Sequence, residues 1–166
     1  MAAPTPSRPY MPGYGIVGPN EGRGLLPWSW AEERLAKSHD YWVATARPDG
    51  RPHLMPVWGA WDGEALWFSS SRRSSKARNL AGEPRCSAAT DNAWEPVVIE
   101  GGVSVVTDHD ALVRFIDMTN EKYETSYGVD FLDPSVNATF RLAPSWAFGL
   151  TEDDFPGSPT RWSFDS

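Results

Sequence analysis

The 166-residue sequence predicts an all-β fold with minor helices, in which six antiparallel strands form a small Greek-key or split β-barrel. Two turn signals, Pro48-Asp49-Gly50 and Asp62-Gly63, separate three β-rich runs and predict two consecutive hairpins. The strands do not alternate regularly with helices, as they would in a doubly wound sheet. Closure into a barrel is the usual way for such strands to avoid exposed edges.

The two ends of the chain are predicted to lie outside this barrel. Residues 1–27 contain six prolines and five glycines, which favour an extended arm over a helix or a paired strand and leave it able to wrap a neighbouring molecule. Residues 151–166 carry the acidic run Glu152-Asp153-Asp154 and are predicted to form a C-terminal tail. The compact domain is therefore expected at residues 28–150.

The first half of the domain is predicted to contain one helix and a three-stranded meander. Residues 28–38 fit a helix with Ser29 as its N-cap, because Glu32 follows it at the capping-box spacing. Pro52 and Pro56 remove donors from the second strand, so that strand should be bulged or have a free edge. The three strands are expected at residues 41–47, 53–61 and 64–69.

The second half is predicted to add two helices and the remaining strands. Gly101-Gly102 interrupts the longest β-rich run and predicts a bulge there. Gly128 follows an amphipathic stretch at the position of a C-terminal helix cap. The helices are expected at residues 71–81 and 108–127, and the strands at residues 85–90, 97–107, 137–142 and 146–150, the last two joined or broken at Pro144.

Composition excludes several classes of function. The net charge of −7 and the pI near 4.9 argue against general binding of nucleic acid or an anionic membrane. The single cysteine, Cys86, excludes a disulfide framework and a cysteine-based zinc site. The three histidines lack the spacing of metal ligands, so no metal is expected. No targeting signal and no apolar stretch of about 20 residues is present, which indicates a cytoplasmic protein.

A serine-rich basic segment gives the strongest local signal for a binding site. Residues 72–85 hold five Lys or Arg and one Glu in an otherwise acidic chain. A helix that begins near Arg72 would offer free N–H groups to an anion and would place Arg72, Ser75 and Lys76 on one face. The alternative is an ordinary solvated basic helix with serine caps. The candidate phosphate ligands are Ser69, Ser70, Arg72, Ser74, Ser75 and Lys76.

Aromatic residues near this segment are candidates to stack on a flat heteroaromatic cofactor, although most tryptophans belong to hydrophobic cores. The candidates are Trp58, Trp61, Trp67 and Trp94. His53 stands alone, and no nucleophile motif such as G-x-S-x-G accompanies it, so no catalytic residue is predicted. Any chemistry is therefore expected to come from a bound cofactor.

Four blocks of the sequence, in order and spacing, resemble one family. They are residues 41–59 (YWVATARPDGRPHLMPVWG), 66–70 (LWFSS), 74–80 (SSKARNL) and 95–101 (EPVVIEG). The chain is similar over residues 28–150 to the pyridoxamine 5′-phosphate oxidase-like, FMN-binding split barrels, and within them to the flavin/deazaflavin oxidoreductases of actinobacteria. This resemblance implies a homodimer with a cofactor in the groove between two barrels.

The resemblance also assigns candidate roles. The ring system would lie along His53, Met55, Pro56, Val57 and Trp58, the phosphate would bind at Ser69, Ser70, Ser75 and Lys76, and Trp58 and Trp94 would wall the acceptor. Flavin-dependent members commonly carry Ser-Arg-Lys at the position of Ser74-Ser75-Lys76, so an arginine is absent unless Arg72 or Arg78 replaces it. This departure and the arginine-rich, lysine-poor composition favour the deazaflavin coenzyme F420, with FMN as the alternative. The anionic tail of F420 would contact Arg72, Arg73 or Arg78.

Three functions follow from the resemblance. The first is an F420-dependent oxidoreductase that transfers hydride to a small unsaturated or quinone-like acceptor. The second is an FMN-dependent oxidoreductase similar to pyridoxamine-phosphate oxidase. The third is a protein that binds a flavin, haem or tetrapyrrole without turnover, because no proton donor is identified in the sequence.

Overall fold

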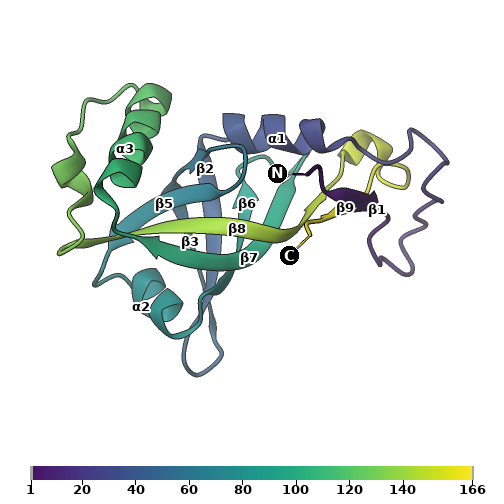
Figure 1. Cartoon of the computed structure of the whole chain (residues 1–166). Helices are drawn as coiled ribbons and strands as arrows, with labels where there is room; N and C mark the ends of the chain where they lie inside the picture. The colour runs from purple at the N-terminus through teal and green to yellow at the C-terminus, as the bar shows by residue number, and fades with distance from the viewer. Residues whose placement is uncertain (1, 166) are drawn as a thin grey trace.

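A computed structural model describes residues 2–165 and shows one curved antiparallel sheet (Figure 1). The order is β1-β9-β8-β7-β6-β2-β3, and β5 pairs with β8 and with β4. The predicted all-β, split-barrel class is confirmed, with nine strands in place of six. The strands are β1 (Thr5–Ser7), β2 (Asp40–Ala46), β3 (Pro52–Trp58), β4 (Ala60–Trp61), β5 (Leu66–Ser71), β6 (Arg85–Thr90), β7 (Val97–Val106), β8 (Asn137–Gly149) and β9 (Thr160–Ser163).

The sheet curls because β8 changes partner along its length. One edge of β8 pairs with β7, while the other edge pairs with β5 over residues 137–142 and with β9 over residues 146–149. The strands β3 and β5 share no ladder, which leaves the barrel split between them. Because β3 pairs with β2 alone, the free edge predicted from Pro52 and Pro56 is confirmed.

Two glycines shape the sheet where the backbone approaches another strand closely. The register between β7 and β8 shifts at Glu100/Gly101, which confirms the predicted bulge, and a Cβ at Gly101 would lie 2.0 Å from the Ala143 oxygen. At Gly59 the predicted strand 53–61 is wrong, because it divides into β3 and β4. The Gly59 amide donates to Tyr123 Oη (3.0 Å) and its carbonyl accepts from Lys122 Nζ (2.8 Å), so this residue is taken out of the ladder.

Within residues 2–165, three α-helices and two 3-10 turns lie around the sheet: α1 (Trp28–Lys37), α2 (Ser75–Gly82), α3 (His109–Tyr123), η1 (Val129–Leu132) and η2 (Glu152–Asp154). The predicted Ser29 cap of α1 is wrong, because Pro27 occupies that position without a side-chain hydrogen bond. Tertiary packing holds this end instead, since the Trp28 ring packs edge-on against Trp162 (5.5 Å) and Phe164 (5.1 Å). In Figure 1, α1 and α2 lie at opposite ends of β2.

The predicted C-terminus of α3 at residue 127, with Gly128 as its cap, is also wrong. The helix ends four residues earlier, where Glu124 adopts a left-handed conformation (φ 55°) and its N–H donates to the Asn120 carbonyl. The Asn120 side-chain oxygen accepts from the Tyr127 amide (2.9 Å) and from Thr125 Oγ1 (2.9 Å). This side chain folds the following residues back and ends the helix.

Both terminal segments belong to the sheet. β1, within the proline-rich arm, pairs with β9, within the acidic tail, and β9 pairs with β8. Arg8 Nη1 donates to the Pro159 carbonyl (2.9 Å), and the Trp162 side chain is fully buried in the main core. The sheet therefore extends past residue 150, and the arm lies on its own chain. Among the described residues, no helix is long and apolar enough to cross a membrane.

Candidate functional site

A cluster of serines and one lysine forms where β5 runs into α2. Ser74 caps the helix, because its hydroxyl accepts from the Ala77 amide (3.1 Å). The Ser70 hydroxyl donates to Ser74 Oγ (2.9 Å) and accepts from Lys76 Nζ (3.2 Å). The fold therefore brings together Ser70, Ser74 and Lys76, three of the residues predicted to hold a phosphate, at the N-terminus of a helix.

Lys76 is the charged centre of this cluster. Its side chain is half-buried, and burial lowers the pKa of its ammonium group below the ordinary value. Within residues 2–165, no carboxylate lies within ion-pair distance of Lys76, and its hydrogen-bond partner is the neutral Ser70 hydroxyl. A partly desolvated ammonium without a counterion attracts an anion strongly.

His53 faces the same end of the barrel from β3. It lies opposite Thr45 in the β2–β3 ladder, and Thr45 Oγ1 accepts from the buried Asn79 side chain on α2 (3.0 Å). Desolvation, followed by the charges of Arg47 and Lys76, lowers the pKa of His53. Its Nδ1 atom is buried and has no hydrogen-bond partner in the part of the chain that the structure describes. This orphaned ring nitrogen is free to bond to a ligand.

The other residues predicted to contact the ring system of a cofactor lie on the two opposite faces of β3. Met55 and Val57 pair with Val43 and Tyr41 and share the inner face with His53. Pro56 and Trp58 point to the outer face with Leu54, because side chains alternate along a strand. Of the inner-face pair, Val57 is buried and Met55 is 45% exposed. A ligand inside the split would therefore contact the side chain of Met55, but only the backbone of Pro56.

Trp58 and Trp94 lie away from the serine–lysine cluster. Trp58 pairs with Asp40 at the far end of β3. It lies five residues from His53, so the two are about 17 Å apart at a rise of about 3.3 Å per residue. Its ring stacks on Tyr123 of α3 (4.1 Å, 3°). Trp94 is 71% exposed on the β6–β7 loop, where its carbonyl accepts from the Glu152 amide. Both rings lie at the α1 end of the sheet.

The remaining predicted ligands point elsewhere. Ser69 Oγ donates to the Ala138 carbonyl (3.2 Å) on β8, on the other face of β5 from Ser70. Arg72 Nε donates to the Pro134 carbonyl. The prediction that Arg72 shares a helical face with Ser75 and Lys76 is wrong, because α2 begins only at Ser75, after the Ser74 cap.

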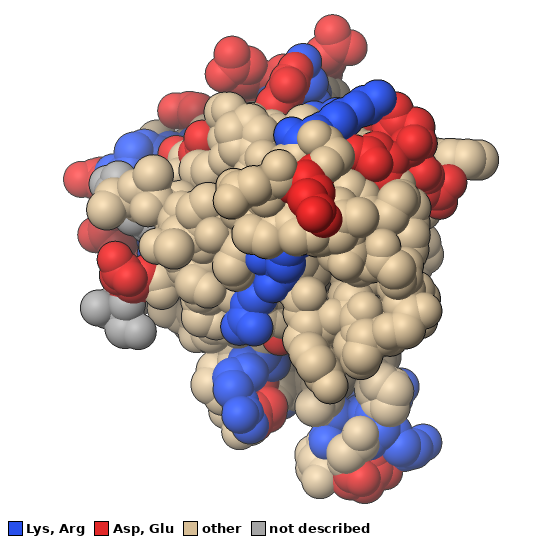
Figure 2. Space-filling view, turned by 90° about the vertical axis from the view of Figure 1, so that its right-hand side faces the viewer, with Lys and Arg blue, Asp and Glu red and all other residues tan. Residues whose placement is uncertain are grey.

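A basic groove next to this cluster was not predicted as a unit. Two adjoining pockets of about 390 and 410 Å³ lie between the β2–β3 hairpin and α2, and both are lined by Arg47, Arg78 and Asn79. Arg51 and Ser75 line the first of them, and Arg51 pairs with Asp49 (2.7 Å). Lys and Arg side chains gather at the lower end of the molecule in Figure 2, where Figure 1 shows the hairpin and α2. The sequence predicts the hairpin that carries Arg47 and Arg51. It contains no pattern that would place these two residues opposite Arg78.

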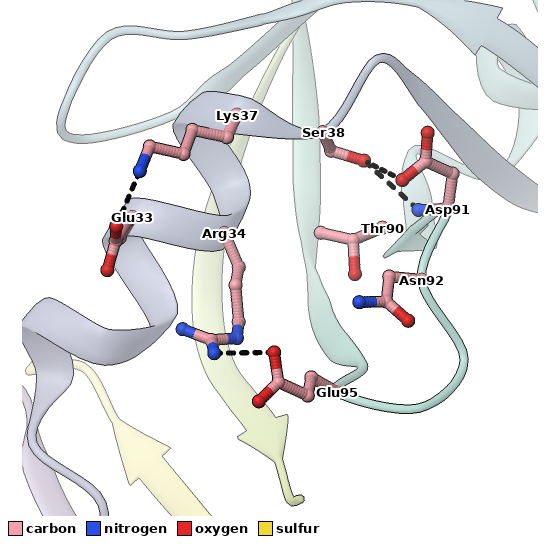
Figure 3. Close-up of a pocket in the computed structure, with 8 residues that line it drawn as sticks. All are labelled: Glu33, Arg34, Lys37, Ser38, Thr90, Asp91, Asn92 and Glu95. Carbon is pink, nitrogen blue, oxygen red and sulfur yellow. Dashed lines mark hydrogen bonds and ion pairs between the residues drawn. The ribbon is translucent and has the colours of Figure 1, made fainter.

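Another pocket, of about 290 Å³, lies between α1 and the segment 90–95 (Figure 3). Both of its cations are already paired with carboxylates. Arg34 pairs with Glu95 (2.6 Å), Lys37 pairs with Glu33 (2.6 Å), and Asp91 accepts from the Ser38 hydroxyl (3.1 Å). Because each cation here has a carboxylate partner, this pocket offers an anionic ligand less than the Lys76 cluster does.

The structure also places the single cysteine and the other two tryptophans, Trp61 and Trp67, that were candidates to stack on a cofactor. Cys86 is buried, and desolvation raises the pKa of its thiol to about 12, so it is an inert thiol. Trp67 packs on Phe115 of α3 (5.9 Å), and Trp61 packs against the main core. No group of three potential metal ligands occurs in the described part of the chain.

Solved structures share this fold. An F420 reductase is 27% identical, with a TM-score of 0.58 over 70% of this chain and 94% of the other. Two further structures are less than 25% identical and share the fold alone. The conserved hypothetical protein Rv2991 from Mycobacterium tuberculosis is 24% identical (TM-score 0.63, 83% and 85% coverage), and the heme storage protein HutZ from Vibrio cholerae is 20% identical (TM-score 0.54, 70% and 86% coverage).

No curated protein matches this chain. The family model of pyridoxamine 5′-phosphate oxidase matches residues 30–148, a range that includes every strand from β2 to β7 and almost all of β8. The resemblance drawn from the four sequence blocks is thus confirmed. The chain belongs to the pyridoxamine 5′-phosphate oxidase family.

Proposed function

We propose that the protein is an F420-dependent oxidoreductase of the cytoplasm that transfers hydride to a small unsaturated or quinone-like acceptor. The observation that carries this proposal is the half-buried Lys76 ammonium, which has no carboxylate partner among residues 2–165 and lies at the serine-capped start of α2. The site fits a phosphate, because the Lys76 ammonium keeps two N–H donors beyond its bond to Ser70, and the Ser74 hydroxyl keeps its own proton. The orphaned His53 nitrogen offers a further polar contact.

The basic groove favours F420 over FMN. On α2, Lys76 faces Ser70, whereas Ser75, Arg78 and Asn79 face the β2–β3 hairpin. A ligand whose phosphate binds at Lys76 can extend an anionic chain past Ser75 toward Arg78 and Arg47. F420 carries such a chain of glutamates beyond its phosphate, and FMN ends at the phosphate. FMN, as the alternative cofactor, would leave the groove unused.

The chain supports the reaction by binding and by excluding water. When bound, the deazaflavin supplies the hydride. Met55 and Val57 offer an apolar inner face along β3, and Lys76 with Ser74 would hold one end of the ligand. Positioning of this kind brings two reactants together without a catalytic side chain. The third candidate function, binding without turnover, has the same contacts and differs only in the absence of an acceptor reaction.

We further propose that two copies of this chain form a homodimer with the cofactor at their interface. The outer face of β2 and β3 exposes three large apolar side chains, Trp42 (44%), Leu54 (56%) and Trp58 (45%), and β3 is an unpaired edge. Exposed apolar groups on neighbouring strands mark an interaction surface. This face lies directly behind Met55 and Val57, so a partner there would border the proposed site.

The proposed function is tested by titration and turnover. Tryptophan fluorescence is followed while the protein is titrated with F420, with the deazaflavin lacking its glutamates, and with FMN. We expect F420 to bind more tightly than FMN, and removal of the glutamates to weaken binding by about tenfold, because charge-assisted contacts to arginine are lost. Reduced F420 should then be oxidised in the presence of enones or quinones. Tight binding without oxidation above background would instead assign the protein to binding without turnover.

The dimer is tested by one substitution on the outer face. Trp42→Glu places a charge in the centre of the proposed interface, and we expect it to shift the sedimentation coefficient from that of a dimer to that of a monomer. Trp94→Glu, on the exposed β6–β7 loop, is the matched control and should leave the dimer intact. A monomeric wild-type protein at micromolar concentration would contradict this proposal.

A further inference from the structure

Lys122, in the last turn of α3, has a setting unlike that of the other two lysines. Its Nζ donates to Tyr41 Oη (2.9 Å) and to the Gly59 carbonyl (2.8 Å), and it lies 4.6 Å from the centre of the Tyr41 ring. Tyr41 Oη in turn donates to the Leu35 carbonyl, so its oxygen presents a lone pair to the lysine. Lys122 thus joins α3 to β2 and to the turn between β3 and β4.

Both acceptors of Lys122 are neutral. Asp40 on β2 and Asp91 after β6 contribute longer-range charge, but neither lies within ion-pair distance in the described structure, where Asp40 pairs with His39 and Asp91 bonds to Ser38. An ammonium and a neutral amine can each donate two hydrogen bonds to these acceptors. The site therefore tolerates the neutral, nucleophilic form of the amine.

Burial favours that neutral form. Desolvation lowers the pKa of Lys122 to about 8, against the opposing effect of Asp91 and Asp40. At pH 7 about one molecule in ten would then carry a neutral amine, compared with about one in 3,000 for a lysine of ordinary pKa. By contrast, Lys37 is exposed and pairs with Glu33 (2.6 Å).

Lys122 also lines a pocket between α1, α3 and β4. The pocket has a volume of about 320 Å³, and its other lining residues are Ala36, Ala60, Trp61, Met118 and Glu121. Four of these five side chains are apolar or aromatic. A nucleophilic amine beside a partly apolar pocket is an arrangement with which enzymes capture carbonyl compounds.

We propose that Lys122 captures small aldehydes with an aromatic or short aliphatic body in this pocket, as a site separate from the proposed cofactor site. The amine lone pair attacks the carbonyl carbon, and a proton moves from nitrogen to oxygen to give a carbinolamine. Loss of water then forms the C=N bond of an imine. The reaction is reversible and requires no oxidant or reductant. The apolar body of the aldehyde lies against Trp61 and Met118.

The proposal is tested by trapping the imine. The full chain is incubated with benzaldehyde and cyanoborohydride between pH 6 and pH 10, and labelling of Lys37, Lys76 and Lys122 is measured by peptide mass spectrometry. At pH 7.5 we expect at least about tenfold more labelling at Lys122 than at Lys37, with a midpoint near pH 8. The α-amino group of the chain is read on its own peptide and does not affect the comparison.

A variant that fills the pocket distinguishes the effect of the pocket from the reactivity of the amine alone. Ala36 is exposed at the pocket and lies on the surface of α1, so Ala36→Phe fills the space without disturbing the core. We expect labelling of Lys122 in this variant to fall by at least about tenfold, and labelling of Lys37 to stay the same. Equal labelling of Lys37 and Lys122 in the wild type, or no effect of Ala36→Phe, would overturn the proposal. Neither outcome depends on cofactor binding.

Discussion

Replacing Trp162 by alanine is expected to lower the free energy of unfolding by about 3–5 kcal/mol. The side chain is fully buried and packs against two tryptophans of α1, edge-on to Trp28 (5.5 Å) and stacked near Trp30 (6.5 Å). Its loss would leave a large cavity where β9, β8 and α1 meet. The surrounding rings are rigid and cannot collapse to fill that cavity, so the cost should lie at the upper end for core substitutions.

Urea denaturation followed by far-UV circular dichroism measures this effect. Trp94→Ala is the matched control, because Trp94 is 71% exposed and its truncation should change the unfolding free energy by less than about 0.5 kcal/mol. If the free energy of unfolding of Trp162→Ala lay within about 1 kcal/mol of the wild-type value, the tail would not be part of the core. The prediction depends on the fold alone and is independent of any ligand.

Replacing Lys76 by methionine is expected to weaken binding of F420 by about 1.5–3 kcal/mol, or roughly 10- to 150-fold in Kd. Methionine retains an unbranched stem of similar length and removes the charge together with the hydrogen bond to Ser70. Burial lowers the pKa of Lys76, which means that the fold disfavours its charged form relative to the unfolded chain. The substitution therefore should not reduce stability, and any loss of affinity reports on the ligand.

Fluorescence titration of wild type, Lys76→Met and Lys37→Met separates this contact from a general effect of charge. Both substitutions remove one positive charge, but Lys37 lies on α1 and pairs with Glu33 (2.6 Å), away from the proposed site. Lys37→Met should bind F420 as tightly as the wild type. Equal affinities for all three proteins would show that the phosphate does not bind at Lys76.

Local sequence signals gave reliable predictions where the interacting residues are close in the chain. The two hairpin turns, the bulge at Gly101 and the free edge of β3 all depend on the backbone preferences of glycine and proline, which act within a few residues. The resemblance to the family likewise rested on short contiguous blocks, so it could be read from the sequence.

Predictions failed where a side-chain contact overrode a local backbone preference. Asn120 ends α3 before Gly128 by accepting from the backbone of Tyr127, and Lys122 and Tyr123 hold Gly59 out of the strand ladder. The C-terminal segment contains acidic and turn-forming residues. It has no hydrophobic periodicity that would identify Trp162 as a core residue. These effects depend on which segments meet in space.

By itself, the sequence determined the all-β class, the hairpins, the bulge and the serine–lysine segment that starts α2. Only the tertiary structure decided that Lys76 bonds to Ser70 beside His53, that Arg47 faces Arg78 across a groove, and that Lys122 lines a partly apolar pocket. The reason is physical. Turn and strand preferences arise from neighbouring residues, whereas burial, charge pairing and pocket shape arise from contacts between segments far apart in the chain.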